Sequence, residues 1–315
     1  MKGRDKYILF FRQCLKSCRN ARIRLYSCRK SKQVYTQHQL IAIYSLMKFA
    51  KSHYRDVVSL VEIMPGVQKI LDLTQIPHHT TIQKFAKRFS KSKIDALIAV
   101  HSMNKFESIL GIDASGFSSD NASKYYAVRI KGDCPMKHYV KDSICVDVFT
   151  KLITSCVVDI GPRNDNVEFI PVLQKSKIAP VVVVADKGYD SEKNHKYVNS
   201  LNAVSMIPVK RNVRRGKYRM KMKKKFSERI YHKRSVTETV FSVMKRKFGS
   251  DVYAKSDEMR IIEVYWINFT YNLHRLVQMQ VGFIWMISTE PREARIRSAL
   301  SDIHSECHTR DCEVR

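Results

Sequence analysis

The chain has 315 residues, of which 44% are hydrophobic, and this excludes a disordered protein while allowing one sizeable core and a smaller accessory domain. Its 57 Lys and Arg against 29 Asp and Glu give a net charge of +28. Such an excess opposes compaction unless a polyanion neutralises part of it, so nucleic acid is the expected partner, with an anionic membrane surface as the alternative. No apolar run reaches about 18 residues, and the first residues lack a signal-peptide layout. We therefore expect a cytoplasmic, nucleoid-associated protein with no membrane partner.

The first 35 residues are predicted to form a flexible basic arm. Positions 1–32 contain eleven Lys or Arg and one acid, and their apolar periodicity is weak. Cys14, Cys18 and Cys28 lie in this arm and could bind zinc together with His38. However, the chain has no C-x-x-C pair, and the alternative, that these cysteines are ordinary small apolar residues, is favoured.

Residues 36–105 are predicted to form a domain of short helices. Apolar residues recur at helical spacing over 40–50, 57–64 and 67–73, and a last helix follows Thr80 or Thr81, either of which can cap it. That last helix carries Lys84, Lys87 and Arg88 away from its apolar stripe. A helix-turn-helix-like DNA-binding domain fits this order, and a helical bundle with a solvated charged face is the alternative.

Residues 106–280 are predicted to form an α/β (α+β) domain with a mixed sheet flanked by helices. Strands are expected at 109–115, 125–130, 144–149, 153–160, 181–184 and 203–208, the third and fourth of them forming a hairpin. The run of four valines at 181–184 is typical of a central strand buried on both faces. Helices are expected after Asp165 or Asn166, over 192–199, from about 230, and over 258–278.

A basic insertion and a polar tail complete this organisation. Ten of the 17 residues at 209–225 are Lys or Arg and none is acidic. Because like charges repel, we expect a mobile loop or hairpin there that becomes ordered against the phosphate backbone of DNA. Its candidate DNA contacts are Lys221, Lys223, Lys224 and Lys225. Residues 281–315 show no clear apolar face and are expected to form a polar tail.

Two aspartates follow apolar strand sequences. Asp113 comes after 109–112, and Asp186 after 181–185. Open α/β sheets place their active sites at such strand ends, and a carboxylate beside a buried run needs a cation or a partner. The alternative is that each aspartate belongs to a turn and caps the helix that follows.

A third pattern lies in the C-terminal third of the chain. Tyr231, Arg234, Glu238 and Lys245 have the spacing Y-x2-R-x3-E-x6-K. Steps of three, four and seven residues return to nearly the same side of a helix, so one face is expected to carry a carboxylate, two cations and a phenol. A surface ladder of ion pairs would look similar.

Together, the stretches I112-D113-A114, A185-D186-K187-G188-Y189-D190-S191 and the Y-x2-R-x3-E-x6-K pattern resemble the three catalytic motifs of insertion-sequence DDE transposases of bacteria and archaea. The resemblance covers roughly residues 36–280. It implies a ribonuclease H-like core in which Asp113, Asp186 and Glu238 bind two divalent metal ions. It also implies that Arg234 and Lys245 contact the DNA of the element's ends and that Tyr231 helps to position the terminal nucleotides.

The implied reaction accounts for these residue types. Carboxylates are hard oxygen ligands for Mg²⁺ or Mn²⁺, and two such ions promote in-line phosphoryl transfer, so no small-molecule cofactor is expected. The expected partners are double-stranded DNA, as element ends and as target, and a second copy of the chain in the DNA complex. The alternatives are a catalytically inactive DNA-binding protein of transposase descent and a ribonuclease H-like nuclease.

Overall fold

The computed structural model describes residues 3–102, 108–119 and 139–283. The chain forms two compact units. Within the described residues, the first unit comprises 3–101, 117–119, 139–140 and 243–283, and the second comprises 102, 108–116 and 141–242. Within the described residues, no helix has both the length and the apolarity needed to cross a bilayer.

The first unit is helical. Its helices are α1 (Gly3–Asn20), α2 (Gln37–Phe49), α3 (Tyr54–Glu62), α4 (Pro65–Leu71), α5 (His79–Arg88), α6 (Lys91–Ala99) and α13 (Asp257–Phe283). Helix α13 contacts α1, α2 and α6, and its buried Trp266 packs on Tyr44, with ring centroids 4.8 Å apart, and on Phe89 at 5.5 Å. Residues 258–278 were expected within the α/β domain over 106–280, whereas the structure groups this helix with the N-terminal ones.

Helix α1 replaces the flexible arm expected over the first residues. Its buried side chains Phe10, Phe11, Cys14 and Cys18 recur at helical spacing, so they form one apolar stripe that packs into the first unit. The dense positive charge obscured this stripe in the sequence. Because Cys14 and Cys18 are fully buried in this apolar stripe, the structure favours their interpretation as ordinary small apolar residues.

Two helix starts show how local sequence sets the boundaries. Thr36 caps α2 in a capping box with Gln39, since the Gln39 amide donates to the Thr36 hydroxyl at 3.1 Å and the Thr36 amide donates to the Gln39 side chain at 2.7 Å. Helix α5 is capped by His78, so it begins before Thr80 and Thr81, the residues expected to cap it. Those threonines occupy its first turn instead.

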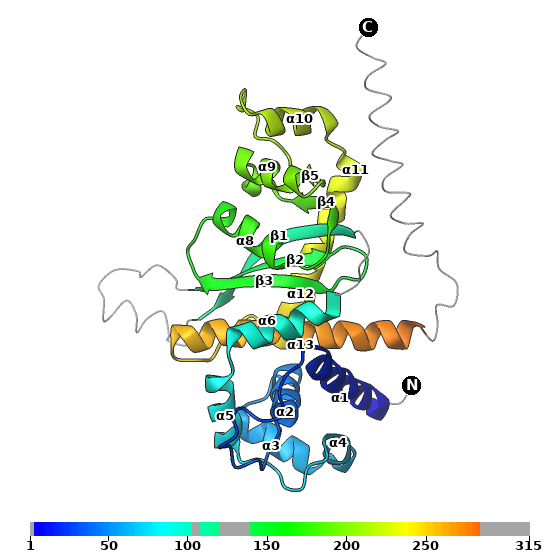
Figure 1. The fold of residues 1–315 in the computed structure, drawn as a ribbon, viewed down its shortest axis with the longest axis vertical. Coiled ribbons are helices and arrows are strands. Elements are labelled where there is room, and N and C mark those ends of the chain that lie inside the picture. The colour runs from blue at the N-terminus through cyan, green and yellow to red at the C-terminus, as the bar shows by residue number, and fades with distance from the viewer. Residues whose placement is uncertain (1–2, 103–107, 120–138, 284–315) are drawn as a thin grey trace, which may run out of the picture. The chain divides into compact units, whose positions relative to one another are not determined.

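The second unit is built on a five-stranded mixed sheet with the order β3-β2-β1-β4-β5 (Figure 1). Its strands are β1 (Ser108–Ser118), β2 (Tyr139–Asp147), β3 (Ile153–Ile160), β4 (Pro180–Ala185) and β5 (Val204–Met206). Strand β4 runs parallel to both β1 and β5. A short turn joins β2 to β3, its neighbour in the sheet, as the sequence predicts. The strand expected at 125–130 lies outside the described residues.

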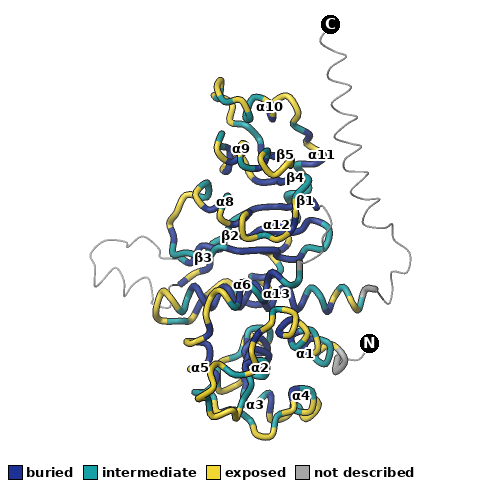
Figure 2. The backbone as a smooth tube through the Cα atoms, in the orientation of Figure 1, coloured by how far each residue is buried: buried dark blue, intermediate teal, exposed yellow. Residues whose placement is uncertain are grey.

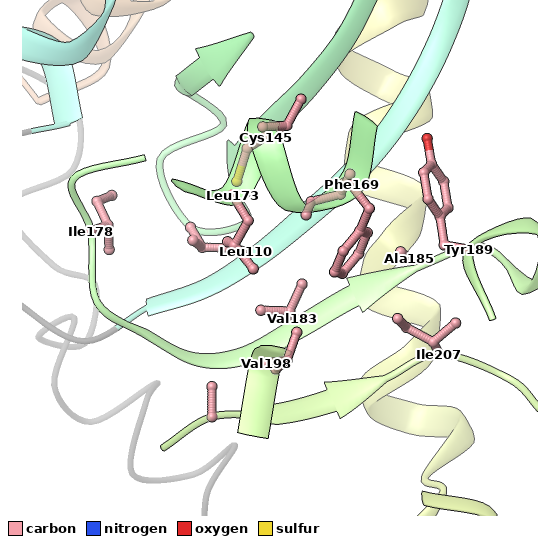
Figure 3. Close-up of a cluster of buried hydrophobic side chains, with 13 residues drawn as sticks. Leu110, Cys145, Phe169, Leu173, Ile178, Val183, Ala185, Tyr189, Val198 and Ile207 are labelled. Atoms are coloured by element: carbon pink, nitrogen blue, oxygen red, sulfur yellow. The ribbon is translucent and has the colours of Figure 1, made fainter. Parts of the chain in front are cut away.

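The two faces of this sheet are buried by different helices, whose bounds are α8 (Asp165–Lys175), α9 (Glu192–Ser200), α10 (Lys217–Lys225), α11 (Glu228–Tyr231) and α12 (Ser235–Phe248). On one face, Leu110 and Val183 of the strands pack against Phe169 and Leu173 of α8 (Figure 3). On the other face, Val182 and Val184 join a cluster with Ile230 of α11. Burial on both faces confirms the interpretation of the valine run as a central strand.

The basic insertion contains a helix, so an extended loop or hairpin is the wrong description of residues 217–225. Helix α10 contacts α9 and buries one side chain, Met222, in the cluster formed by Val182, Val184 and Ile230. Most of the rest of α10 is partly or fully exposed (Figure 2).

Candidate active site

The pairing of β1 with β4 places Asp113 and Asp186 beside each other. The last paired residues are Ile112 and Ala185, so the two aspartates occupy the next position on neighbouring parallel strands. Side chains alternate along a strand, and both aspartates therefore follow the parity of Ile109 and Val184, which face α11. Asp186 directly follows β4, as expected. Asp113, in contrast, lies within β1, because this strand continues to Ser118 beyond its partner.

A close approach at Gly111 brings α12 against this face. A Cβ atom built on Gly111 would lie 2.7 Å from Cγ2 of Thr237, so only glycine fits here without a shift of its neighbour. Thr237 immediately precedes Glu238 on α12. The glycine therefore allows the helix that carries the third acid to lie directly over the strand that carries the first.

Thr237 also holds Asp113. Its hydroxyl donates to Asp113 Oδ2 at 3.1 Å, and the Ala114 amide lies 2.9 Å from Oδ1. Burial raises the pKa of the Asp113 carboxyl, although these hydrogen bonds and Arg234 act in the opposite direction. Thr237 was not among the residues predicted from the sequence. The one signal that could have indicated it is its position directly before Glu238 of the signature pattern.

Arg234 joins two of the three acids. Its Nη2 atom lies 2.5 Å from Glu238 Oε1, and its Nη1 atom lies 3.6 Å from Asp113 Oδ2. Partial burial lowers the pKa of Arg234, but the Glu238 carboxylate outweighs this effect, so the pKa of Arg234 is raised above its ordinary value. The guanidinium is thus the cation that Asp113 and Glu238 share.

Tyr231, at the end of α11, connects this helix to Asp186. Its hydroxyl donates to Asp186 Oδ1 at 3.3 Å, and the Arg234 guanidinium lies 5.9 Å from its ring centroid. Partial burial raises the pKa of the Tyr231 phenol, so this group is a neutral donor at physiological pH. Through Arg234 and Tyr231, the described contacts link all three acids into one polar cluster.

The signature residues do not lie on one uninterrupted α-helix. Tyr231 ends α11, a 3-10 turn over His232–Arg234 follows, and Glu238 and Lys245 lie on α12. The contacts of Tyr231, Arg234 and Glu238 agree with the common face predicted from their spacing. Lys245 belongs to the first unit, where its ammonium lies 5.7 Å from the ring centroid of Phe117.

A second polar network docks the basic helix. The buried Asp190 carboxylate accepts two hydrogen bonds from Arg219, at 2.8 and 2.5 Å, and one from the Lys210 amide at 2.9 Å. The Glu192 carboxylate accepts hydrogen bonds from the backbone amides of Tyr218 and Arg219. These amides lie in the first turn of α10, where backbone donors have no partner within the helix. Burial opposes ionisation of Asp190, but its own donors outweigh it and lower its pKa.

This Asp190–Arg219 network was missed because it joins residues 29 positions apart. The only signal in the sequence is that Asp190 and Glu192 closely follow Asp186.

The remaining DNA-contact candidates lie on exposed helical surface. Lys84, Lys87 and Arg88 are exposed on α5, and Lys221, Lys223, Lys224 and Lys225 are exposed on α10. Neither set belongs to the polar cluster around Asp113.

Chemically, the cluster combines hard oxygen donors, a cation and a neutral hydroxyl. In the described part of the chain, no three His, Cys, Asp or Glu side chains lie together in a group that could hold a metal ion. The guanidinium of Arg234 occupies the position between Asp113 and Glu238 instead.

The chain matches a known protein family. The family model described as the transposase DDE domain matches residues 104–273, more than half of the chain. These residues include both aspartates, the basic helix and the whole signature pattern. None of the curated proteins compared with the chain matches it.

Proposed function

This chain belongs to the transposase DDE-domain family, and we propose that it cuts DNA at the ends of an insertion sequence and joins the freed 3′-hydroxyl to target DNA. Family membership makes it a transposase, an enzyme that acts on DNA, with a ribonuclease H-like core. The choice of element ends, the cleavage and the strand transfer are the proposal. One observation carries it: Asp113 and Asp186 occupy adjacent strand positions on the sheet face where Arg234 and Tyr231 link them to each other and to Glu238.

The acids suit divalent metal ions by their donor chemistry. All three are carboxylates, and two of them already share a cation in Arg234. We therefore propose Asp113, Asp186 and Glu238 as the ligands of two Mg²⁺ or Mn²⁺ ions. When bound, such ions activate the attacking oxygen and stabilise the leaving oxygen of an in-line displacement.

The surrounding residues orient these acids and the DNA. Thr237 contacts one oxygen of Asp113, and we assign to Tyr231, whose hydroxyl donates to Asp186, the role of positioning the terminal nucleotides. Arg234 is the cation of the cluster, and in the DNA complex we assign it a phosphate contact, as we do for Lys245. Both assignments follow the resemblance of the signature pattern and the positive charge of the residues.

We further propose that the two exposed basic helices hold the DNA. Helix α5, with Lys84, Lys87 and Arg88, would recognise the element's ends as part of a helix-turn-helix-like domain. Helix α10, with Lys221 and Lys223 to Lys225, would contact the phosphate backbone, because its lysines are exposed and the Arg219–Asp190 hydrogen bonds hold the helix in place. Since two ends must be joined, a homodimer is expected in the complex.

The test is cleavage of a supercoiled plasmid that carries the inverted repeats flanking the gene. Wild-type protein with Mn²⁺ or Mg²⁺ should cut at the repeats and form joined products. Asp113→Asn, Asp186→Asn and Glu238→Gln should each lose more than about 100-fold in cleavage rate, equivalent to about 2.7 kcal/mol of transition-state stabilisation. Binding to end DNA should stay within a few-fold of wild type.

Matched controls exist for both residue types. Asp159→Asn on β3 and Glu228→Gln at the start of α11 remove carboxylates outside the cluster and should cut normally. Full activity of Glu238→Gln would contradict the assignment of the acids. Wild-type protein that binds but never cuts would be an inactive descendant, and cutting that ignores the repeats would indicate a nuclease.

A further inference from the structure

We propose that the loop over 26–35 and helix α5 form a binding groove for one phosphate backbone of duplex DNA. The proposal rests on the proposed function and adds a site to it, because the candidate DNA contacts considered so far are on α5, on α10 and in the signature pattern. The groove is a cavity of the first unit.

This loop–α5 groove has a volume of about 640 Å³ and is lined by the loop, the first turn of α2, one side of α5 and the start of α6. Among its lining side chains none is acidic, and five are cationic: Lys30, Lys32, Lys84, Arg88 and Lys93. A groove lined by one sign of charge concentrates the field within it, so it attracts an anion of extended shape.

The five cations are available to a ligand. None of them forms an ion pair with a described residue, and Lys30, Lys32, Lys84 and Arg88 are exposed. The ammonium of Lys93 lies 5.4 Å from the ring centroid of Phe89, a buried wall of the groove, where it keeps its donors. Phosphate oxygens would complete these groups, and DNA carries a dense row of them.

The loop is held in place without a helix or strand of its own. The amide of Gln37 donates to the Leu25 carbonyl at 2.6 Å, and the Gln37 side chain donates to the Arg24 carbonyl at 2.9 Å. At the other end, the Tyr35 hydroxyl donates to the Ile76 carbonyl at 3.2 Å. Since both ends are tied to the helical framework, Lys30 and Lys32 are presented beside α5 at little extra cost in chain entropy.

The arrangement also separates two kinds of contact. Lys84 and Arg88 are four residues apart and point to the groove side of α5, whereas Lys87 is not among the lining residues. A helix that enters the major groove reads bases with one side while neighbouring segments hold the backbone. The loop is therefore assigned to the backbone that flanks the bases facing α5.

The experiment measures the salt dependence of DNA binding by the full chain. The variant Lys30→Gln/Lys32→Gln/Lys93→Gln is compared with Lys16→Gln/Lys69→Gln/Lys255→Gln, which removes the same charge from positions of the first unit outside the groove. Affinities for an element-end duplex and a random duplex are measured over about 50–300 mM salt. The groove variant should lose about 2–3 units of the slope of log affinity against log salt, at about 0.9 per phosphate contact.

The loss should be equal on the two duplexes, because backbone contacts carry no base information. A slope no shallower than that of the control variant would overturn the groove. A loss confined to the element-end duplex would overturn the backbone assignment. Unchanged unfolding midpoints of both variants keep the comparison valid. If the wild-type protein cuts normally but the slopes agree, only the groove fails, whereas steep binding without cleavage would leave the groove and reject the proposed function.

Discussion

At the scale of single residues, the candidate site depends on a missing side chain as much as on the acids. Asp113 and Asp186 are visible in the sequence as polar residues after apolar runs, and Glu238 stands out by its spacing. Gly111 and Thr237 are not visible in this way, because they matter through the contact between a strand and a helix that lie far apart in the chain. A sequence pattern reports periodicity within an element and does not report how closely two elements approach.

Replacing Gly111 by Ala should therefore disturb both stability and the site. The new methyl group would overlap with Cγ2 of Thr237. The single hydroxyl hydrogen of Thr237 is shared between two acceptors, Asp113 Oδ2 at 3.1 Å and the Arg234 carbonyl at 2.8 Å, and this arrangement resists rotation of the side chain. We expect a loss of about 1–3 kcal/mol in the free energy of unfolding, the usual range for overpacking. Urea denaturation measures it.

Thr237→Ser supplies the matched background, since serine keeps the hydroxyl and removes the methyl group. In that background Gly111→Ala should cost clearly less, and the difference is the coupling between the two positions. Equal costs in both backgrounds would mean that the Gly111–Thr237 contact does not determine the approach of α12.

At the scale of elements, the sequence predicted those segments whose own periodicity determines them. The apolar runs became β1, β3 and β4, and the helical patterns became α2, α8, α9 and α13. Helices α1 and α10 were missed for one physical reason. Both are rich in like charge, and what makes them helical is tertiary: an apolar stripe on α1 packs into the helical unit, and Asp190 and Glu192 hold the first turn of α10.

Arg219→Ala should release α10 from α9. The substitution leaves the fully buried Asp190 carboxylate with two fewer hydrogen bonds, and we expect a cost of about 2–4 kcal/mol, somewhat below that of a wholly buried pair because Arg219 is partly exposed. Because the pKa of Asp190 is lowered, this contribution is present above the ordinary aspartate pKa of about 4 and is lost as the pH falls below it. Hydrogen exchange of residues 217–225 at pH 7 reports the release directly.

Arg215→Ala is the control for this experiment, since it removes an exposed arginine of the same segment and should leave the exchange of α10 slow. Arg219→Lys keeps the charge without the paired hydrogen bonds and should fall between the two. Slow exchange in Arg219→Ala would show that Met222 and Glu192 alone hold the helix.

At the scale of the whole molecule, the dominant property is a net charge of +28. Asp113, Glu238 and Asp190 each form an ion pair with an arginine, so these acids do not offset the charge of the exposed lysines. Many lysines of α5, of α10 and of the loop–α5 groove are exposed to solvent. The fold therefore carries a repulsive energy that the proposed DNA partner would relieve.

The thermal stability of the full chain should consequently respond to salt in opposite directions with and without DNA. Without DNA, raising the salt from about 0.05 to 0.5 M shortens the Debye length from roughly 14 Å to 4 Å, screens the repulsion and should raise the Tm by a few degrees. With a saturating duplex at low salt, binding to the folded state should already raise the Tm. At a hundredfold excess of duplex over Kd, binding adds about 2.7 kcal/mol to the free energy of unfolding. Added salt then weakens binding and should lower the Tm towards the value without DNA. Sodium chloride and scanning calorimetry suffice for both series, and a neutral osmolyte at matched osmolarity controls for effects other than screening. A Tm without DNA that is constant or falls with salt would mean that repulsion among the excess positive charges does not limit the stability of the fold.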